Sequence, residues 1–390
     1  MNSPAMRAAL AGLFAMAAAM GIGRFVYTPV LPHMLESGAL TASQAGTVAG
    51  VNFLGYLIGA LAASSRRFAA RRSTWFFFAL AVSVATTAAM SVTTGLVEML
   101  WFRFLSGVAS AFSMIFITAL VMARLAHESR PGLIVLHFGG VGFGIAGSAM
   151  LVSVLAASGS HWREQWLFAG VAALVAWIAV RLLLPKALSE TSTVQSSAHS
   201  THLPAGLAWL IASYGLFGFG YVITATFINA MAKSVPALAP VEPWVWIVVG
   251  LAGAPSAWLW NRFAARTSIM FAYCAACIAE AVGVMASVTL QVPLVLIMSA
   301  ILLGGTFMAI TMLGLAQART MAPHNAAAVI AYMTASFGLG QMIGPVVAGF
   351  LFEHSGSLWS ASLLASAVLV LSVISTLPMY RLARSPQSSM

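Results

Sequence analysis

The chain alternates between long apolar stretches and short polar connections. A membrane-spanning helix needs about 20 mainly apolar residues, and twelve stretches of this protein are long enough. We therefore predict an all-α membrane protein with twelve transmembrane helices. The stretches lie at approximately 8–31, 42–64, 74–93, 97–122, 132–157, 163–184, 205–230, 243–262, 267–288, 293–317, 326–352 and 358–380.

The first stretch follows a basic residue, Arg7, as the apolar core of a secretory signal peptide does. It stays apolar well beyond the length of such a core. We therefore expect it to be retained as a helix.

Positive charge is concentrated in alternate connections. Hydrophobic residues make up 61% of the chain and charged residues 7%, with a net charge of +10. Fourteen Arg and Lys residues fall on the side of the two termini, and Arg163 and Lys233 fall on the opposite side. Cytoplasmic connections carry such an excess, so the basic residues predict cytoplasmic termini and do not indicate a nucleic-acid surface.

One long polar segment divides the chain. Residues 187–202 are rich in Ser and Thr and contain His199 and His202. Two His without Cys or carboxylate neighbours are a weak metal site, so we interpret the segment as a solvated linker. The predicted organisation is a six-helix bundle at 1–185, a cytoplasmic linker at 186–204 and a second six-helix bundle at 205–390.

The two halves share sequence landmarks. The sequence RFAAR occurs at 67–71 and again at 262–266, an offset of 195 residues. Gly-x-Gly at 21–23 recurs at 218–220, and Gly107 matches Gly304, both at an offset of 197. Six stretches separate each pair, so the halves have one orientation and form two parallel six-helix repeats.

Arg24 lies inside the first apolar stretch, where a charge costs roughly 2.5 to 3.5 kcal/mol on insertion scales. At helical spacing it shares a face with Met20, Gly21, Tyr27 and Thr28, so small and polar residues gather on the charged side. Two interpretations stay open. Arg24 either snorkels to the nearer membrane surface or binds an anionic ligand in a cavity.

Several motifs together carry a family resemblance. They are GIGRFVYTP at 21–29, NFLGY at 52–56, RFLSG at 103–107, GFGY at 218–221, GGTF at 304–307 and GLGQMIGP at 338–345. With twelve stretches in two parallel halves, the sequence resembles the major facilitator superfamily and, within it, the YbfB/YjiJ family of bacterial transporters. The resemblance covers nearly the whole chain. It implies the major facilitator fold, alternating-access transport and the bacterial inner membrane, but no particular substrate.

The connection after the second stretch departs from the superfamily pattern. The superfamily usually has an Asp there, and this chain has Ala63 in its place. The departure leaves open whether the four basic residues of this connection gate the transporter or only set its topology. They are Arg66, Arg67, Arg71 and Arg72.

Two literal motif matches have simpler explanations. GFGIAG at 142–147 matches the dinucleotide-binding Gly pattern, but it lies inside an apolar stretch and no strand precedes it. We expect these glycines to allow close helix packing. Cys274 and Cys277 match the redox pattern Cys-x-x-Cys, but they lie within the ninth stretch, where we expect them to pack as small core residues.

Polar residues inside the apolar stretches are the candidates for substrate binding. Arg24 and Arg103 lie at similar depth in the first and fourth stretches, and Tyr221 aligns with Arg24 in the repeat. Stretches one, four, seven and ten carry no carboxylate except Glu98 at a boundary, so a bound anion would neutralise the site. The predicted substrate-binding residues are Arg24, Tyr27, Thr28, Asn52, Tyr56, Arg103, Ser106, Ser110, His137, Tyr214, Tyr221, Thr306 and Gln341.

Two residues are candidates for proton coupling. His137 is the one His within a predicted span and an imidazole titrates near neutral pH, while Glu280 is the carboxylate nearest a helix centre. For each, a structural hydrogen bond is the competing interpretation. Gln341 precedes Gly344 and Pro345, which predicts a locally broken helix whose free carbonyls face a cavity.

Three function classes follow. The leading one is a secondary active transporter for a small organic solute, most consistent with an anion, and the alternative is a proton-coupled drug or cation exporter of the same fold. A membrane enzyme or receptor is disfavoured because the chain has no Asp and no His/Glu cluster. We expect no cofactor and no metal, a monomer in the lipid bilayer, and a small-molecule substrate with protons as the candidate coupling ion.

Overall fold

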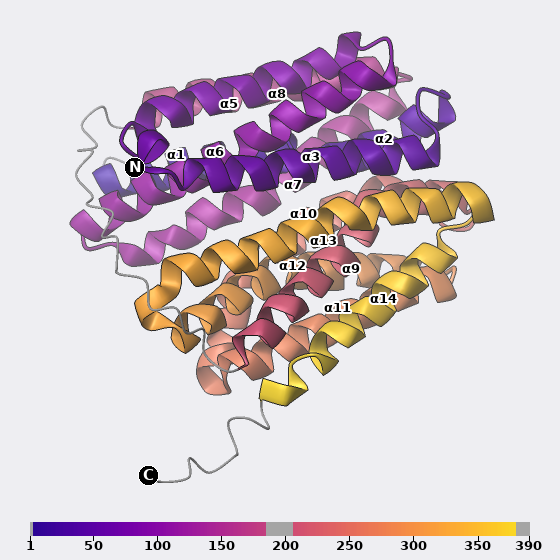
Figure 1. The fold of residues 1–390 in the computed structure, drawn as a ribbon. Coiled ribbons are helices and arrows are strands. Elements are labelled where there is room, and N and C mark those ends of the chain that lie inside the picture. The colour runs from indigo at the N-terminus through magenta and orange to yellow at the C-terminus, as the bar shows by residue number, and fades with distance from the viewer. Residues whose placement is uncertain (1–2, 185–205, 380–390) are drawn as a thin grey trace.

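The computed structural model describes residues 3–184 and 206–379. Every regular element in these ranges is a helix. The helices form two groups that lie one above the other in Figure 1, with the first half of the chain in indigo and magenta and the second in salmon to yellow.

The first group follows the chain order of the predicted spans. Its helices are α1 (Pro4–Met16), η1 (Ala17–Ile22), α2 (Tyr27–Glu36), α3 (Ala42–Ala63), α4 (Arg66–Ala69), α5 (Arg72–Ala89), η2 (Met90–Val92), α6 (Leu96–His127), η3 (Pro131–Leu133), α7 (Ile134–Ala157) and α8 (Trp162–Leu183).

The second group begins after the undescribed segment. Its helices are α9 (Leu207–Ser234), η4 (Ala239–Val241), α10 (Glu242–Arg266), α11 (Ile269–Thr289), α12 (Pro293–Met321), η5 (Pro323–Asn325), α13 (Ala326–Ser355) and α14 (Trp359–Ile374).

Twelve helical spans in the described residues are long and apolar enough to cross a membrane, which confirms the predicted number. The predicted bounds are close to the observed ones, and the main differences are extensions into polar sequence. The fourth span runs to His127 because Arg124 pairs with Glu128 one turn later, at 3.0 Å. The linker expected at 186–204 lies outside the described residues, so the proposed bundle boundaries stay a prediction.

Large apolar side chains cover the outside of the molecule. Along α8 they are exposed on one face, and this set comprises Leu167, Phe168, Val171, Leu174, Val175, Ile178 and Leu182. An apolar face this long would be a liability in water. Lipid accepts it, so the exposure agrees with the twelve spans.

The internal repeat is visible in helix packing. A Cβ added at Gly107 of α6 would lie 2.0 Å from the carbonyl oxygen of Asn52, and one at Gly304 of α12 would lie 2.2 Å from that of Val249. Asn52 and Val249 are themselves 197 residues apart. The same backbone contact therefore recurs in both halves, which confirms the parallel repeat.

The first span is not a regular helix. Its middle is the π-helix η1, and residues 23–26 form turns before α2 begins. Gly23 and Phe25 donate their backbone N–H groups five residues back, to Ala18 and Met20. Arg24 therefore lies in a distorted turn, which corrects the regular helical face expected for it.

α13, in contrast, is continuous from Ala326 to Ser355, with Pro345 inside it. The break predicted next to Gln341 is wrong. Proline removes one backbone donor, and a helix in lipid tolerates it when neighbours satisfy the freed carbonyl. The carbonyl oxygen of Pro345 packs closely against Gly46 in the other half. A Cβ added at Gly46 would lie only 2.1 Å from that oxygen.

The two halves meet along α3 with α13, α7 with α10, and α2 with α9. Several hydrogen bonds cross between them near the end of the molecule that holds Glu36, Ser234 and Ser355, which we call the far end. There Lys233 contacts Glu36 at 2.7 Å, and Glu353 accepts from Thr41 Oγ1 at 2.8 Å. The chain therefore closes the space between the halves at the far end.

Candidate functional site

Arg24 lies between the two halves and is only 4% exposed. Its Nη2 donates to Oε1 of Gln341 on α13 at 3.0 Å, and Nε2 of Gln341 donates to the hydroxyl of Tyr221 on α9. Tyr221 is the repeat equivalent of Arg24. The sequence predicted all three as site residues. In the structure they form one hydrogen-bonded chain that joins the two halves.

Aromatic rings surround the Arg24 guanidinium. Its central carbon lies 4.5 Å from the ring centre of Phe53 and 4.2 Å from that of Tyr56, both on α3, and 5.5 Å from Phe25. Such contacts stabilise a buried cation. The ion pairs of the described residues do not include Arg24, and its Nε has no hydrogen-bond partner there. The charge is thus held without a carboxylate.

Arg103 of α6 holds the distorted turn in place. It donates from Nη1 to the carbonyl of Gly23 at 2.8 Å and from Nη2 to that of Arg24 at 2.9 Å. Ser106 also donates to the Gly23 carbonyl, and Asn52 donates to the carbonyl of Arg103. Arg103 and Ser106, expected to bind substrate, thus satisfy backbone carbonyls that the irregular turn leaves free, and Asn52, expected to do the same, bonds to the backbone of α6 instead.

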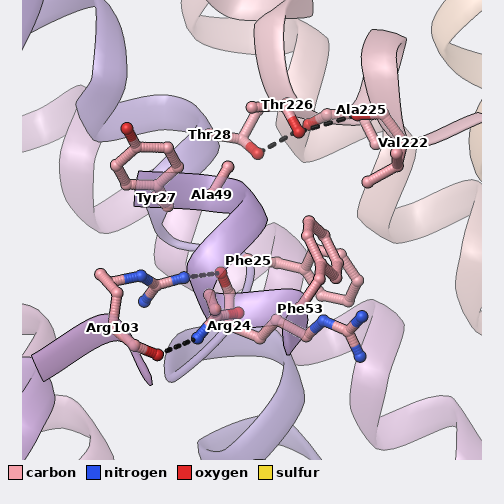
Figure 2. A pocket seen from close by; sticks show the side chains of 11 residues that line it. Arg24, Phe25, Tyr27, Thr28, Ala49, Phe53, Arg103, Val222, Ala225 and Thr226 are labelled. Atoms are coloured by element: carbon pink, nitrogen blue, oxygen red, sulfur yellow. Dashed lines mark hydrogen bonds between the residues drawn. The ribbon is translucent and has the colours of Figure 1, made fainter. Parts of the chain in front are cut away.

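A small cavity lies beside these residues (Figure 2). Its lining combines Arg24, Tyr27, Thr28, Asn52 and Arg103 from one half with Val222, Ala225 and Thr226 from the other, together with Phe25, Ala49 and Phe53. About 20 Å³ of it can be occupied by water, which is room for one molecule. The site is therefore closed in this structure.

Two contacts close the cavity on its far-end side. Thr28 donates to the carbonyl of Ala225 at 2.7 Å, and the indole of Trp246 donates to the carbonyl of Phe25 at 3.2 Å. Both join one half to the other. A ligand can enter from the far end only when the halves move apart there.

Four of the predicted tyrosine and serine site residues also make hydrogen bonds apart from the Arg24–Gln341–Tyr221 chain. Tyr27 donates to the carbonyl of Ala45, Tyr56 to the sulfur of Met114, Ser110 to the carbonyl of its own helix at Gly107, and Tyr214 to the carbonyl of Thr311. Tyr56 also stacks on Arg24, so it belongs to the site. Ser110 and Tyr214 are absent from the cavity lining.

The two coupling candidates are buried and lie in different halves. His137 is within 3.0 Å of Thr118, and Thr306 donates to Glu280 at 3.2 Å. Both His137 and Glu280 have 0% exposure, and each keeps one polar atom without a partner in the described residues. No group of three or more potential metal ligands occurs in the described residues.

The basic connection after α3 lies at the surface. Arg67 and Arg71 are exposed and Arg72 is half-buried, whereas the side chain of Arg66 is outside the described part of the chain. The two cysteines of the Cys-x-x-Cys match form no disulfide, and Cys277 is fully buried, as a core residue is.

Sequence reasoning predicted tyrosines at the site but missed its phenylalanines. Phe25 and Phe53 line the cavity, and Phe307 stacks on Tyr221 with 10° between the ring planes. The signal was present, because Phe53 and Tyr56 are three residues apart on α3, as Phe217 and Tyr221 are four apart on α9. In an apolar chain rich in Phe, that spacing was not distinguishable from core packing.

Comparison with solved structures supports the fold. A mutant of the nucleoside transporter NupG superposes with a TM-score of 0.76 at 15% identity, covering 95% of this chain and 100% of that one. A bacterial homologue of the human lysosomal transporter Spinster, inward-facing and unoccupied, gives a TM-score of 0.68 at 14% identity over 98% and 97%. A search of the curated proteins finds no match.

A family model described as "Uncharacterised MFS-type transporter YbfB" matches residues 16–377. It spans the irregular turn, the closed cavity and both groups of helices. The chain therefore belongs to this YbfB family of major facilitator transporters, and it is a multi-pass membrane protein.

Proposed function

We propose that this protein is a secondary active transporter for a small organic anion and that Arg24 binds the anionic group. The observation that carries the proposal is the placement of a buried guanidinium at the junction of the halves with no carboxylate partner in the described residues. An uncompensated buried charge is costly. An anion that enters the site removes that cost, so the site favours anions over cations.

Alternating access supplies the transport step. The cavity lies between two halves that are related by a repeat, and cross-half contacts close it on the far-end side. With cytoplasmic termini, as the distribution of basic residues predicts, the far end faces the periplasm. We place the protein in the bacterial inner membrane. In that orientation this structure is closed toward the periplasm.

Measuring affinity in detergent tests the proposal. The probes are acetate, benzoate and tetraphenylphosphonium, and the proteins are wild type, Arg24→Lys and Arg24→Gln. Lys keeps the charge but loses the planar fork that holds a carboxylate at two points. We expect the Lys variant to bind carboxylates about tenfold or more weakly and the Gln variant not to bind them, since hydrogen bonds to charged groups are worth about 1.5–3 kcal/mol.

Arg163→Gln is the matched control, because Arg163 is exposed on α8 and stacks on Trp162 at 4.9 Å. It should leave carboxylate affinity unchanged. A cation exporter predicts the reverse pattern for Arg24. Tight tetraphenylphosphonium binding by Arg24→Gln, with no carboxylate binding by wild type, would refute the anion proposal.

A further inference from the structure

A group of parallel aromatic rings lies next to the Arg24 contact. Tyr221 of α9 is stacked on Phe337 of α13 with 3° between the planes and 5.8 Å between the centres, and on Phe307 of α12 with 10° and 6.0 Å. Phe217 and Tyr214 extend the group: their ring centres lie 5.6 and 4.9 Å from that of Phe337 with 23° and 27° between the planes, and they are tilted by 41° to each other. We call these five residues the ring stack.

The ring stack is tied directly to Arg24. The hydroxyl of Tyr221 accepts from Gln341, which accepts from Arg24, and Phe337 lies one helical turn before Gln341 on α13. Phe307 also packs edge-on against Phe25, the residue after Arg24, with 6.2 Å between the ring centres. A molecule whose charged end contacts Arg24 therefore has ring faces within reach of its body.

Core packing is the simplest alternative explanation for these rings. Elsewhere in the described residues, ring pairs are tilted or edge-on, as in Phe68–Trp75 at 77° and Phe112–Phe116 at 86°, and all of the stacked pairs belong to the ring stack. Parallel planes are the arrangement that accepts a further flat ring face to face.

Phe337 is also next in sequence to a residue that faces the other half. It keeps partial exposure, although Tyr221 and Phe217 beside it are buried. The next residue, Gly338, faces the other half, because a Cβ there would lie 3.0 Å from the side chain of Leu57 on α3. When α3 and α13 separate to admit a ligand, the ring stack borders the opening.

We propose that the transported anion is an aromatic carboxylate whose ring stacks on Phe337 or Phe307 while its carboxylate contacts Arg24. This proposal rests on the anion transport proposed above and specifies the substrate class. Stacked aromatic pairs are favourable beyond the area they bury. A saturated ring of similar size is more apolar, so an ordinary apolar pocket binds it at least as well.

The test compares benzoate with cyclohexanecarboxylate, which have the same charge and nearly the same size. Binding is measured by calorimetry on the full chain in detergent, with acetate as the probe without a ring. We expect wild type to bind benzoate about 2- to 12-fold more tightly than cyclohexanecarboxylate, the range that stacking supplies. Phe337→Leu or Phe307→Leu, whichever removes the ring on which the ligand stacks, should abolish that preference and keep carboxylate binding that depends on Arg24.

Phe350→Leu is the matched control, because Phe350 lies on the same helix and is 53% exposed. It should keep the benzoate preference. If Phe337→Leu lowers the melting temperature too far for binding measurements, Phe307→Leu provides the same test from α12.

The outcomes separate the two proposals. Equal or tighter binding of cyclohexanecarboxylate, with both acids lost in Arg24→Gln, overturns the aromatic inference and leaves the anion transporter in place. Benzoate preference that survives both Phe337→Leu and Phe307→Leu also overturns it. Absence of carboxylate binding by wild type overturns both proposals.

Discussion

At the scale of single residues, two arginines at similar depth have different roles. Arg24 presents its guanidinium to the junction of the halves, whereas Arg103 uses both of its terminal nitrogens on backbone carbonyls. The sequence predicted both as ligand contacts, since charge and depth are alike. It could not show that a π-helix and an irregular turn would leave carbonyls free for Arg103.

Replacing Arg103 tests this division. Arg103→Gln leaves the carbonyl of Arg24 without its donor and that of Gly23 with Ser106 alone, and a buried unsatisfied group costs about 1–3 kcal/mol. We expect a lower melting temperature in detergent without ligand. Arg24→Gln, by contrast, should lose carboxylate binding with a smaller change in melting temperature. Equal melting temperatures for Arg103→Gln and wild type would contradict a supporting role.

Glu280 is the residue for which a coupling role can be separated from a structural one. It is buried on α11, accepts from Thr306 and has no cationic partner in the described residues. If it carries the coupling proton, Glu280→Gln, which keeps the shape, should abolish accumulation driven by a pH gradient in proteoliposomes and preserve substrate exchange. Accumulation equal to wild type would leave Glu280 a purely structural acceptor, and the same assay on His137→Ala tests the other candidate.

At the scale of elements, the sequence predicted the number and placement of the spans more accurately than their internal shape. Length and apolar composition are enough to find a span. Whether a span is distorted depends on the helices packed against it. In the distorted part of the first span, Gly21 packs directly against the backbone of Gly144 on α7. Gly344 and Pro345 suggested a break in α13, but packing against both halves keeps that helix continuous.

Two glycines of α7 provide a controlled test of close packing. A Cβ at Gly144 would lie 2.6 Å from the Cα of Ala17 in η1, whereas one at Gly147 would meet nothing within 4 Å. Small residues set the distance between helices in lipid. Gly144→Ala should therefore lower the melting temperature and reduce uptake, and Gly147→Ala should change neither. Equal behaviour of the two variants would show that the contact with η1 is not required.

At the scale of the whole molecule, the repeat explains both what sequence could predict and what it could not. An offset of 197 residues relates Gly107 to Gly304 and Arg24 to Tyr221. The fold could therefore be predicted, and so could the placement of Arg24 opposite Tyr221. Gln341, which connects Arg24 to Tyr221, comes from a span outside the aligned pair. The contacts between halves depend on the conformational state, which a linear pattern does not specify.

The far-end contacts predict how that state responds to mutation. Glu353 accepts from Thr41 Oγ1 and from the backbone N–H of Ser43, both at 2.8 Å, and Glu36 contacts Lys233 at 2.7 Å. All of these contacts join opposite halves and break when the far end opens. The exposed Lys233–Glu36 ion pair is worth up to about 1 kcal/mol, and the hydrogen bonds that the exposed Glu353 accepts act in the same direction. Removing both carboxylates should therefore shift the equilibrium toward the conformation in which the far end is open.

The double variant Glu36→Ala, Glu353→Ala tests this by spin-label distances between cysteines placed at Ser37 and Ser357, which are exposed at the far end, with the native cysteines replaced. We expect a longer distance to gain population at the expense of the closed one. Glu128→Ala is the matched control, because it removes an ion pair with Arg124 that lies within one half, and it should leave the distribution unchanged. If the double variant gives the wild-type distribution, the helix contacts alone keep the far end closed, and these carboxylates do not contribute to the transport cycle.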